Sequence, residues 1–198
     1  MKPMADPTTP PVYLGTVAIE PRRWARADEG ALVRLSDWLD AIDAAGFEGI
    51  ELWERHYTAA ETDEQARIRD HRLAIPIFNS YVSLDDPDPT ARAGVAATVA
   101  ALGSTGVKFN VGNDPELVSA YAGRIAGWLD DLPADATLLC ECHHGISIAE
   151  DPTVAAAIFD AAGAGDRLGA IVHTHEDPDH LRARFDAYGD RITHVHVN

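Results

Sequence analysis

Short apolar runs recur along the chain, and segments with helical spacing separate them. We expect strands at seven of these runs: Val12–Glu20, Gly49–Trp53, Leu73–Tyr81, Val107–Gly112, Thr137–His143, Leu168–His175 and Ile192–Asn198. Apolar residues at i, i+3, i+4 and i+7, from Leu35 through Trp38 to Ile42, predict an amphipathic helix after the first run. The pattern as a whole predicts six helices between the seven strands.

Asp-Pro pairs mark the expected starts of the later helices. They are Asp88-Pro89, Asp114-Pro115, Asp151-Pro152 and Asp177-Pro178. Asp accepts hydrogen bonds from the amides of a first helical turn, and Pro at the first helical position loses no bond. Because strands and helices alternate, we expect parallel strands in an α/β fold. The glycine-rich loops of doubly wound nucleotide-binding folds do not occur in the sequence, which favours a barrel.

The fold that we expect is therefore a TIM-type (β/α) barrel that is short or incomplete, with seven strands counted and the eighth missing. The 198 residues fall below the roughly 250 that are usual for this barrel. We expect residues 1–11 to be a disordered leader and residues 12–198 to form a single barrel domain. The chain stops directly after the run ITHVHVN, so we also expect a fragment of a longer enzyme.

Alternation along the strands predicts which side chains face the interior of the barrel. Successive strand residues point to opposite faces, and in five strands one face is apolar while the other turns polar toward the carboxyl end. Active sites of this fold lie at that end. The residues expected to converge there are Glu51, Trp53, Lys108, Asn110, Glu141, His143, His173, His175, His194 and His196.

The histidines favour a metal site. Seven of the nine histidines of the chain lie at or after His143. Imidazoles and a carboxylate that converge from separate strands suit Zn²⁺, Mn²⁺, Co²⁺ or Fe²⁺ better than Ca²⁺. The competing interpretation of a strand histidine is a hydrogen-bonded core residue. A buried lysine such as Lys108 is rare unless it is paired or catalytic.

Other residues have equally plain structural interpretations. Cys140 and Cys142 alternate with Glu141, so we expect small core side chains that point away from the site rather than a thiolate zinc centre. Trp53 is expected either to wall the substrate site or to pack in the core.

Composition narrows the function classes. Asp and Glu number 32 against 16 Lys and Arg, and the net charge of −16 disfavours binding to nucleic acid. No apolar run reaches the roughly 20 residues of a membrane span, so we expect no membrane association. Two cysteines spaced two apart on a strand do not form a disulfide framework, which favours a cytoplasmic location.

Three motifs carry a resemblance to a known family. In this order and spacing, AGFEGIELW, LLCECHHG and RITHVHVN resemble the sugar phosphate isomerase/epimerase family of the xylose-isomerase-like TIM barrel superfamily. The resemblance covers the chain from about Val12 to Asn198. It implies a TIM barrel and a metal-dependent isomerase or epimerase that acts on a small keto-sugar, polyol or hydroxy-acid through an enediolate.

The resemblance also implies roles for individual residues. It implies a divalent metal, Mn²⁺, Co²⁺, Zn²⁺ or Mg²⁺, bound by Glu141, His175 and His196, although His173 is open as an alternative to His175. From the resemblance together with the strand pattern, we expect Glu141 and His143 to be catalytic. We expect the substrate to be bound by Glu51, Trp53, Lys108, Asn110, His173 and His194. The family's fourth ligand, a Glu on strand eight, has no counterpart before the chain ends.

Alternative functions stay open at this point. One is a metal-dependent hydrolase or dehydratase on the same barrel, because H-x-H pairs also occur in metal-dependent hydrolases. Another is a non-catalytic barrel that has lost its site and acts as a binding module. An incomplete barrel exposes strand edges, so a homo-oligomer is possible.

Overall fold

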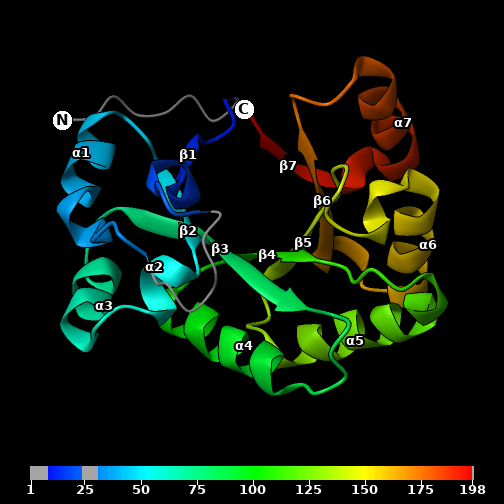
Figure 1. Cartoon of the computed structure of the whole chain (residues 1–198), viewed down its shortest axis with the longest axis horizontal. Coiled ribbons are helices and arrows are strands. Elements are labelled where there is room, and N and C mark those ends of the chain that lie inside the picture. The colour runs from blue at the N-terminus through cyan, green and yellow to red at the C-terminus, as the bar shows by residue number, and fades with distance from the viewer. Residues whose placement is uncertain (1–8, 24–30, 198) are drawn as a thin grey trace. The chain divides into compact units, whose positions relative to one another are not determined.

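The computed structural model describes residues 9–23 and 31–197. The chain forms two compact units, Met1–Pro76 and Ile77–Asn198, and strands alternate with helices in each (Figure 1). Most of the leader expected at residues 1–11 lies outside the described residues.

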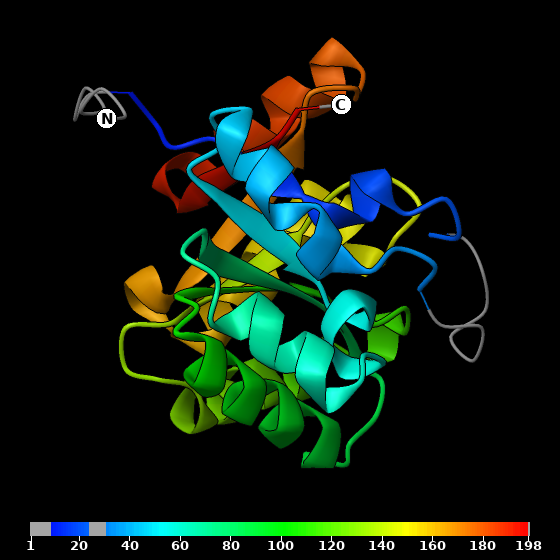
Figure 2. The ribbon, with the colours of Figure 1, turned by 90° about the vertical axis from the view of Figure 1, so that its left-hand side faces the viewer.

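The first unit contains a pair of parallel strands and a set of short helices. Strand β1 pairs with β2 in parallel. Its elements in chain order are β1 (Tyr13–Gly15), η1 (Thr16–Ile19), η3 (Leu35–Asp37), α1 (Leu39–Ala44), β2 (Gly49–Trp53), α2 (Arg55–Thr58) and α3 (Thr62–Arg69). In Figure 2 these helices face the viewer.

Two expectations for this unit need correction. The strand expected at Val12–Glu20 ends at Gly15, and a 3₁₀-helix follows. The hydroxyl of Thr16 accepts a hydrogen bond from the Trp53 amide, which draws the chain out of the strand. The predicted apolar stripe also fails at Trp38, whose exposed fraction is 48%, because the α-helix begins only at Leu39, after a 3₁₀ turn with a different period.

The second unit is built on five strands that lie side by side in chain order. The strands are β3 (Ala74–Ser83), which begins at the boundary between the units, β4 (Gly106–Asn110), β5 (Thr137–Glu141), β6 (Leu168–His173) and β7 (Ile192–His196). Each neighbouring pair is parallel. The strands curl, and helices follow their outer side (Figure 1). These helices are α4 (Thr90–Leu102), α5 (Val118–Asp131), α6 (Pro152–Ala162) and α7 (Pro178–Tyr188).

Alternating helices and parallel strands confirm the α/β class, and the curled sheet of the second unit is barrel-like. The described residues contain seven strands, as expected, and seven α-helices instead of six. The additional helix arises because α2 and α3 divide the segment between β2 and β3. In the described part of the chain, no helix has the length and apolar character needed to cross a membrane.

Two strands of the second unit end earlier than expected. Strand β5 ends at Glu141 and β6 at His173, so His143 and His175 lie in the turns that follow. The amide of His144 donates to the carboxylate of Glu176 (3.1 Å) instead of continuing the strand ladder.

Helix caps and cysteines follow the sequence pattern closely. Asp114, Asp151 and Asp177 each accept a hydrogen bond from a first-turn amide. Cys140 and Cys142 are free thiols with no exposed surface. Burial raises the pKa of Cys140, so its thiol stays protonated.

Candidate functional site

The carboxylate of Glu141, at the end of β5, is the centre of a polar cluster in the second unit. Its Oε1 lies 3.1 Å from Nε2 of His173 on β6. The same oxygen lies 3.8 Å from Nε2 of His143 and 3.8 Å from Nδ1 of His196 on β7. Parallel strands bring these side chains together because each ends at the same edge of the sheet. Three imidazoles therefore surround one carboxylate oxygen.

The imidazole nitrogens also approach one another. Nδ1 of His196 lies 3.1 Å from Nε2 of His173. The ring of His143 lies beside that of His173, with 4.3 Å between their centroids. Nδ1 of His143 lies 2.8 Å from the carbonyl oxygen of His144. Because a carbonyl only accepts, Nδ1 of His143 donates to it, and Nε2 of the same ring faces Glu141.

Lys108 on β4 holds the other oxygen of Glu141. Its Nζ lies 2.7 Å from Oε2 of Glu141, and both side chains are buried. Nζ also donates to Oδ1 of Asn79 (3.2 Å), and it lies 5.0 Å from the centre of the Tyr81 ring. The Glu141 carboxylate is thus divided, with one oxygen paired with an ammonium and the other facing imidazoles.

This environment fixes the charge state of the central pair. Burial raises the pKa of Glu141, but the hydrogen bond with His173 and the charge of Lys108 outweigh burial and lower the pKa to about 2. Burial lowers the pKa of His173, and the contact with Glu141 offsets this only in part. At neutral pH the centre is therefore an ionised carboxylate beside a neutral imidazole.

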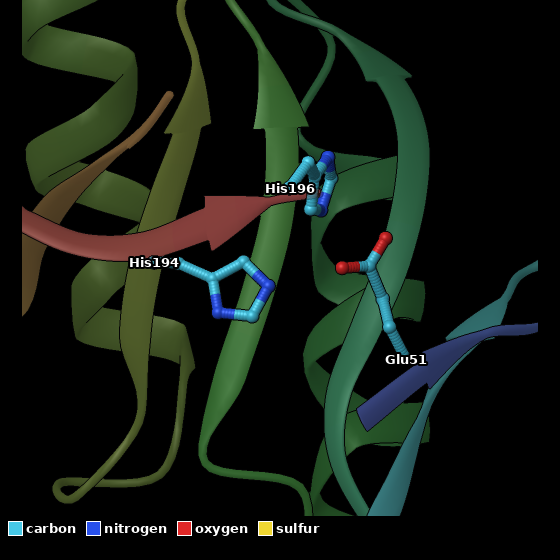
Figure 3. A group of neighbouring side chains, drawn as sticks. All are labelled: Glu51, His194 and His196. Carbon is cyan, nitrogen blue, oxygen red and sulfur yellow. The ribbon is translucent and has the colours of Figure 1, made fainter. Parts of the chain in front are cut away.

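Several residues predicted for the site occupy other places. His175 lies beyond the end of β6 and is exposed, and its ring centre is 5.4 Å from that of His173. The structure thus brings His173, rather than His175, against Glu141. His194 lies two residues before His196 on β7, with 5.2 Å between the ring centres (Figure 3). The side-chain oxygen of Asn110 is buried and has no hydrogen-bond partner among the described residues.

Two predicted site residues belong to the first unit. Glu51, labelled in Figure 3, and Trp53 both lie on β2 and are buried. The Trp53 ring packs edge-on against His56, with 5.1 Å between the ring centres, and the guanidinium of Arg55 lies 5.2 Å from the centre of the same ring. Trp53 therefore packs in the core of the first unit.

Comparison with known proteins adds no assignment. Neither a scan of protein-family models nor a search of curated proteins found a match. The chemistry of the clustered side chains therefore carries the functional assignment.

The donor set around Glu141 fits a divalent metal. Glu141, His143 and His173 offer one ligand atom each, and these atoms lie within 4.8 Å of one another. The ligand atoms of Glu141, His173 and His196 are still closer, with separations of 3.1, 3.1 and 3.8 Å. One carboxylate oxygen with two imidazole nitrogens is a donor set that suits Zn²⁺, Mn²⁺, Co²⁺ or Fe²⁺.

A second buried carboxylate–imidazole pair lies in the first unit. Nε2 of His56 lies 3.2 Å from Oε2 of Glu20, and its Nδ1 lies 3.0 Å from the hydroxyl oxygen of Thr16. The carboxylate of Glu20 also accepts hydrogen bonds from the backbone amides of Arg22 (2.8 Å), Leu32 (3.0 Å) and Val33 (3.1 Å). This pair closes a loop of the chain.

Sequence reasoning missed several residues of these clusters. Asn79 pairs with Lys108 in the register of β3 and β4, and alternation along β3 would have placed it on the same face. The pair formed by Glu20 and His56 has no such signal, because the two residues are 36 apart and their spacing follows no period.

Proposed function

We propose that this protein is a metal-dependent isomerase or epimerase that moves a proton beside the carbonyl of a small keto-sugar, polyol or hydroxy-acid. The observation that carries the proposal is the convergence of three imidazoles on one carboxylate oxygen of Glu141. They belong to His173, His196 and His143. The motifs that resemble the sugar phosphate isomerase/epimerase family support the same chemistry.

The convergence favours a cation because one proton cannot serve all the contacts of the His173 ring nitrogen. A ring nitrogen carries at most one proton, yet Nε2 of His173 lies 3.1 Å from both Glu141 and His196. If that proton is donated to the carboxylate, it is not available for the contact with Nδ1 of His196. A positive ion among these atoms would be shared by the carboxylate and the ring nitrogens, which bind metals in their deprotonated form.

We assign Glu141, His173 and His196 as the residues that hold the metal. His173 thus replaces His175 in the set expected from the sequence, because Nε2 of His173 lies 3.1 Å from Glu141 whereas His175 is exposed beyond the end of β6. A divalent ion held there would supply Lewis-acid stabilisation of negative charge on the substrate oxygens.

The remaining side chains have distinct tasks in this proposal. Lys108 keeps Glu141 ionised and fixed through Oε2. The buried oxygen of Asn110 accepts a hydrogen bond from a substrate hydroxyl, which would give that oxygen the partner it lacks within the described chain. His143 takes the carbon-bound proton of the substrate at Nε2, because Nδ1 is already committed to the His144 carbonyl.

Two measurements test the proposal together. The metal content of purified protein, with thermal unfolding in added Mn²⁺, Co²⁺ or Zn²⁺, tests the metal. Incorporation of deuterium from D₂O into keto-sugars and hydroxy-acids tests the proton transfer. We expect His173→Ala to lose both properties, and His143→Gln to keep the metal but lose exchange. The exposed His180 provides the matched control, and His180→Ala should change neither.

The outcomes that overturn the proposal are definite. Wild-type protein that contains no metal and gains no thermal stability from any of the three ions would eliminate the metal site. Metal binding without exchange on any carbonyl substrate, together with hydrolysis of model esters, would assign the site to a hydrolase instead.

A further inference from the structure

The turn after β5, which begins with His143, is held by two carboxylates. The amide of His144 donates to Oε1 of Glu176 (3.1 Å), and the amide of Gly145 donates to Oε2 of Glu150 (2.7 Å). Both amides lie beyond the end of β5, so side chains rather than a neighbouring strand accept from them. The orientation of the peptide groups in this turn is therefore set by side chains from other segments.

Arg184 on α7 fixes the carboxylate of Glu176. Its Nε donates to Oε2 of Glu176 (2.6 Å) and its Nη2 to Oε1 (2.9 Å), which is a bidentate pair. A third donor, Nη1, reaches the carbonyl oxygen of Glu150 (3.1 Å). The guanidinium and the Glu176 carboxylate are both almost fully buried. Arg184 thus connects the two residues that hold the turn.

The same turn determines which nitrogen of His143 carries the proton. Nδ1 of His143 donates to the carbonyl oxygen of His144 (2.8 Å). Glu176 accepts from the amide of His144, and Glu150 accepts from the amide of Gly145, which shares a peptide group with this carbonyl. A continuous set of contacts therefore runs from Arg184 through Glu176 and the His144 backbone to the His143 ring, and it leaves Nε2 facing Glu141 at 3.8 Å.

We propose that the buried pair Arg184–Glu176 is a positioning device that selects the Nδ1-protonated form of His143 and aims its Nε2 at the site. The inference rests on the proposed function, in which Nε2 of His143 takes the substrate proton. Without the pair the His144 amide loses its acceptor, and the Glu150 carbonyl loses its donor Arg184 next to the residue that holds the Gly145 amide. The His144 carbonyl is then no longer held at Nδ1, and the ring can carry its proton on either nitrogen. Only one of these two forms can accept a proton at Nε2.

Stability alone does not account for this pair. Well-packed apolar side chains commonly replace a buried ion pair without loss of stability, because removing two charges from water is costly. What apolar side chains cannot do is accept from the His144 amide and fix its direction. Contacts of this kind, one step removed from a functional histidine, typically alter function by about 10- to 100-fold when they are removed.

The test uses the full chain and reads the histidine ring directly. Nitrogen-15 NMR of metal-free protein, at a pH where the ring is neutral, reports which nitrogen of His143 carries the proton. We expect the Nδ1-protonated form alone in wild type and a mixture of both forms in Glu176→Gln and Arg184→Lys. Deuterium exchange of substrate should fall at least about 10-fold in both variants, with metal affinity within twofold of wild type.

Matched variants separate positioning from folding. Arg182→Lys is the control on the same helix, since Arg182 is exposed and pairs only with the exposed Asp179 among the described contacts, and it should leave the His143 signal unchanged. In the His143→Gln background, Glu176→Gln should cause no further loss of exchange. Glu176→Gln removes the bidentate ion pair with Arg184 at nearly constant side-chain shape, so it carries the test if Arg184→Lys does not fold.

Two results would overturn the inference. One is wild-type His143 with a mixed or Nε2-protonated ring. The other is a pair of folded variants whose His143 keeps the wild-type form. A wild-type protein without metal or exchange would defeat the proposed function instead, while the ring measurement would still decide whether the pair sets the His143 proton.

Discussion

The two units each bury a glutamate against a histidine, and the surroundings of the two pairs differ completely. Glu20 and His56 in the first unit are 3.2 Å apart, and Glu141 and His173 in the second are 3.1 Å apart. Glu20 is surrounded by donors, since three backbone amides point at its oxygens. Glu141 Oε1 faces ring nitrogens of three histidines instead. The same residue pair thus serves as a closed structural clamp in one unit and as a candidate ligand site in the other.

The two glutamates also differ in what lowers their pKa. Burial raises the pKa of Glu20, but the amides of Arg22 and Val33 and the contact with His56 outweigh it and lower the pKa. Backbone amides are fixed dipoles that belong to the fold. The low pKa of Glu141 depends instead on His173 and Lys108, which are side chains that a ligand can recruit. Glu20 is thus held mainly by the backbone, and Glu141 by side chains.

The largest expected effect is the loss of stability on removing the clamp. Glu20→Ala leaves the amides of Leu32 and Val33 and the His56 ring without their acceptor, so the free energy of unfolding should fall by about 3–5 kcal/mol in urea titrations. The exposed Glu61 is the control, and Glu61→Ala should change stability by less than about 0.5 kcal/mol. A loss below about 1 kcal/mol for Glu20→Ala would show that the amides find other acceptors.

The next effect concerns metal affinity. Glu141→Gln keeps the shape of the side chain and removes its charge, so affinity for Zn²⁺ or Mn²⁺ should fall at least about 100-fold in calorimetric titration. Glu116→Gln, at an exposed glutamate of the second unit, should leave the affinity unchanged. Equal affinity in Glu141→Gln and wild type would mean that the clamp and the cluster are both structural, and the comparison would collapse.

A smaller loss is expected when one imidazole is removed. His196→Ala should lower metal affinity by about 10-fold, because Glu141 and His173 still hold the ion. The variant should unfold at the same urea concentration as wild type in the absence of metal, since the His196 ring is only partly buried. If metal affinity instead falls by the same factor in His56→Gln, the effect arises from general destabilisation.

The smallest effect is a change in the pH dependence of stability. Burial lowers the pKa of His56, and its contacts with Glu20 offset this only in part. The folded state therefore favours the neutral ring. The contribution of His56 to the free energy of unfolding is fully present above the unfolded pKa of about 6.5. It is lost as the pH falls below that value toward and through the folded pKa. Unfolding free energies measured between pH 7 and pH 5 should fall more steeply for wild type than for His56→Gln.

The pKa shift of Glu141 also makes the protein less stable as the pH falls, but in a lower pH range. Its folded pKa of about 2 lies below the unfolded value of about 4.3, so its stabilising contribution is present above pH 4.3 and is lost as the pH falls toward 2. Acid titration of Glu141→Gln should lack this part of the slope.

The sequence predicted the parts of the fold and site that depend on periodicity. Alternation placed Glu141, His173 and His196 on one face of the second unit's strands, and the structure brings them together. Alternation failed where a strand ended early: the preference for His175 over His173 as ligand rested on a strand predicted two residues too long. The Arg184–Glu176 pair and the Glu20–His56 clamp depend on contacts between distant segments, and no local spacing signals them.

The division of the Glu141 carboxylate between Lys108 and the imidazoles has an entropic consequence. Because Nζ of Lys108 already holds Oε2 at 2.7 Å, folding itself removes the rotational freedom of this side chain. A ligand that arrives at Oε1 meets an oxygen already in place and loses little free energy to ordering it. Because this oxygen is fixed in position, a metal ion bound at the proposed site would be selected by its radius as well as by its charge.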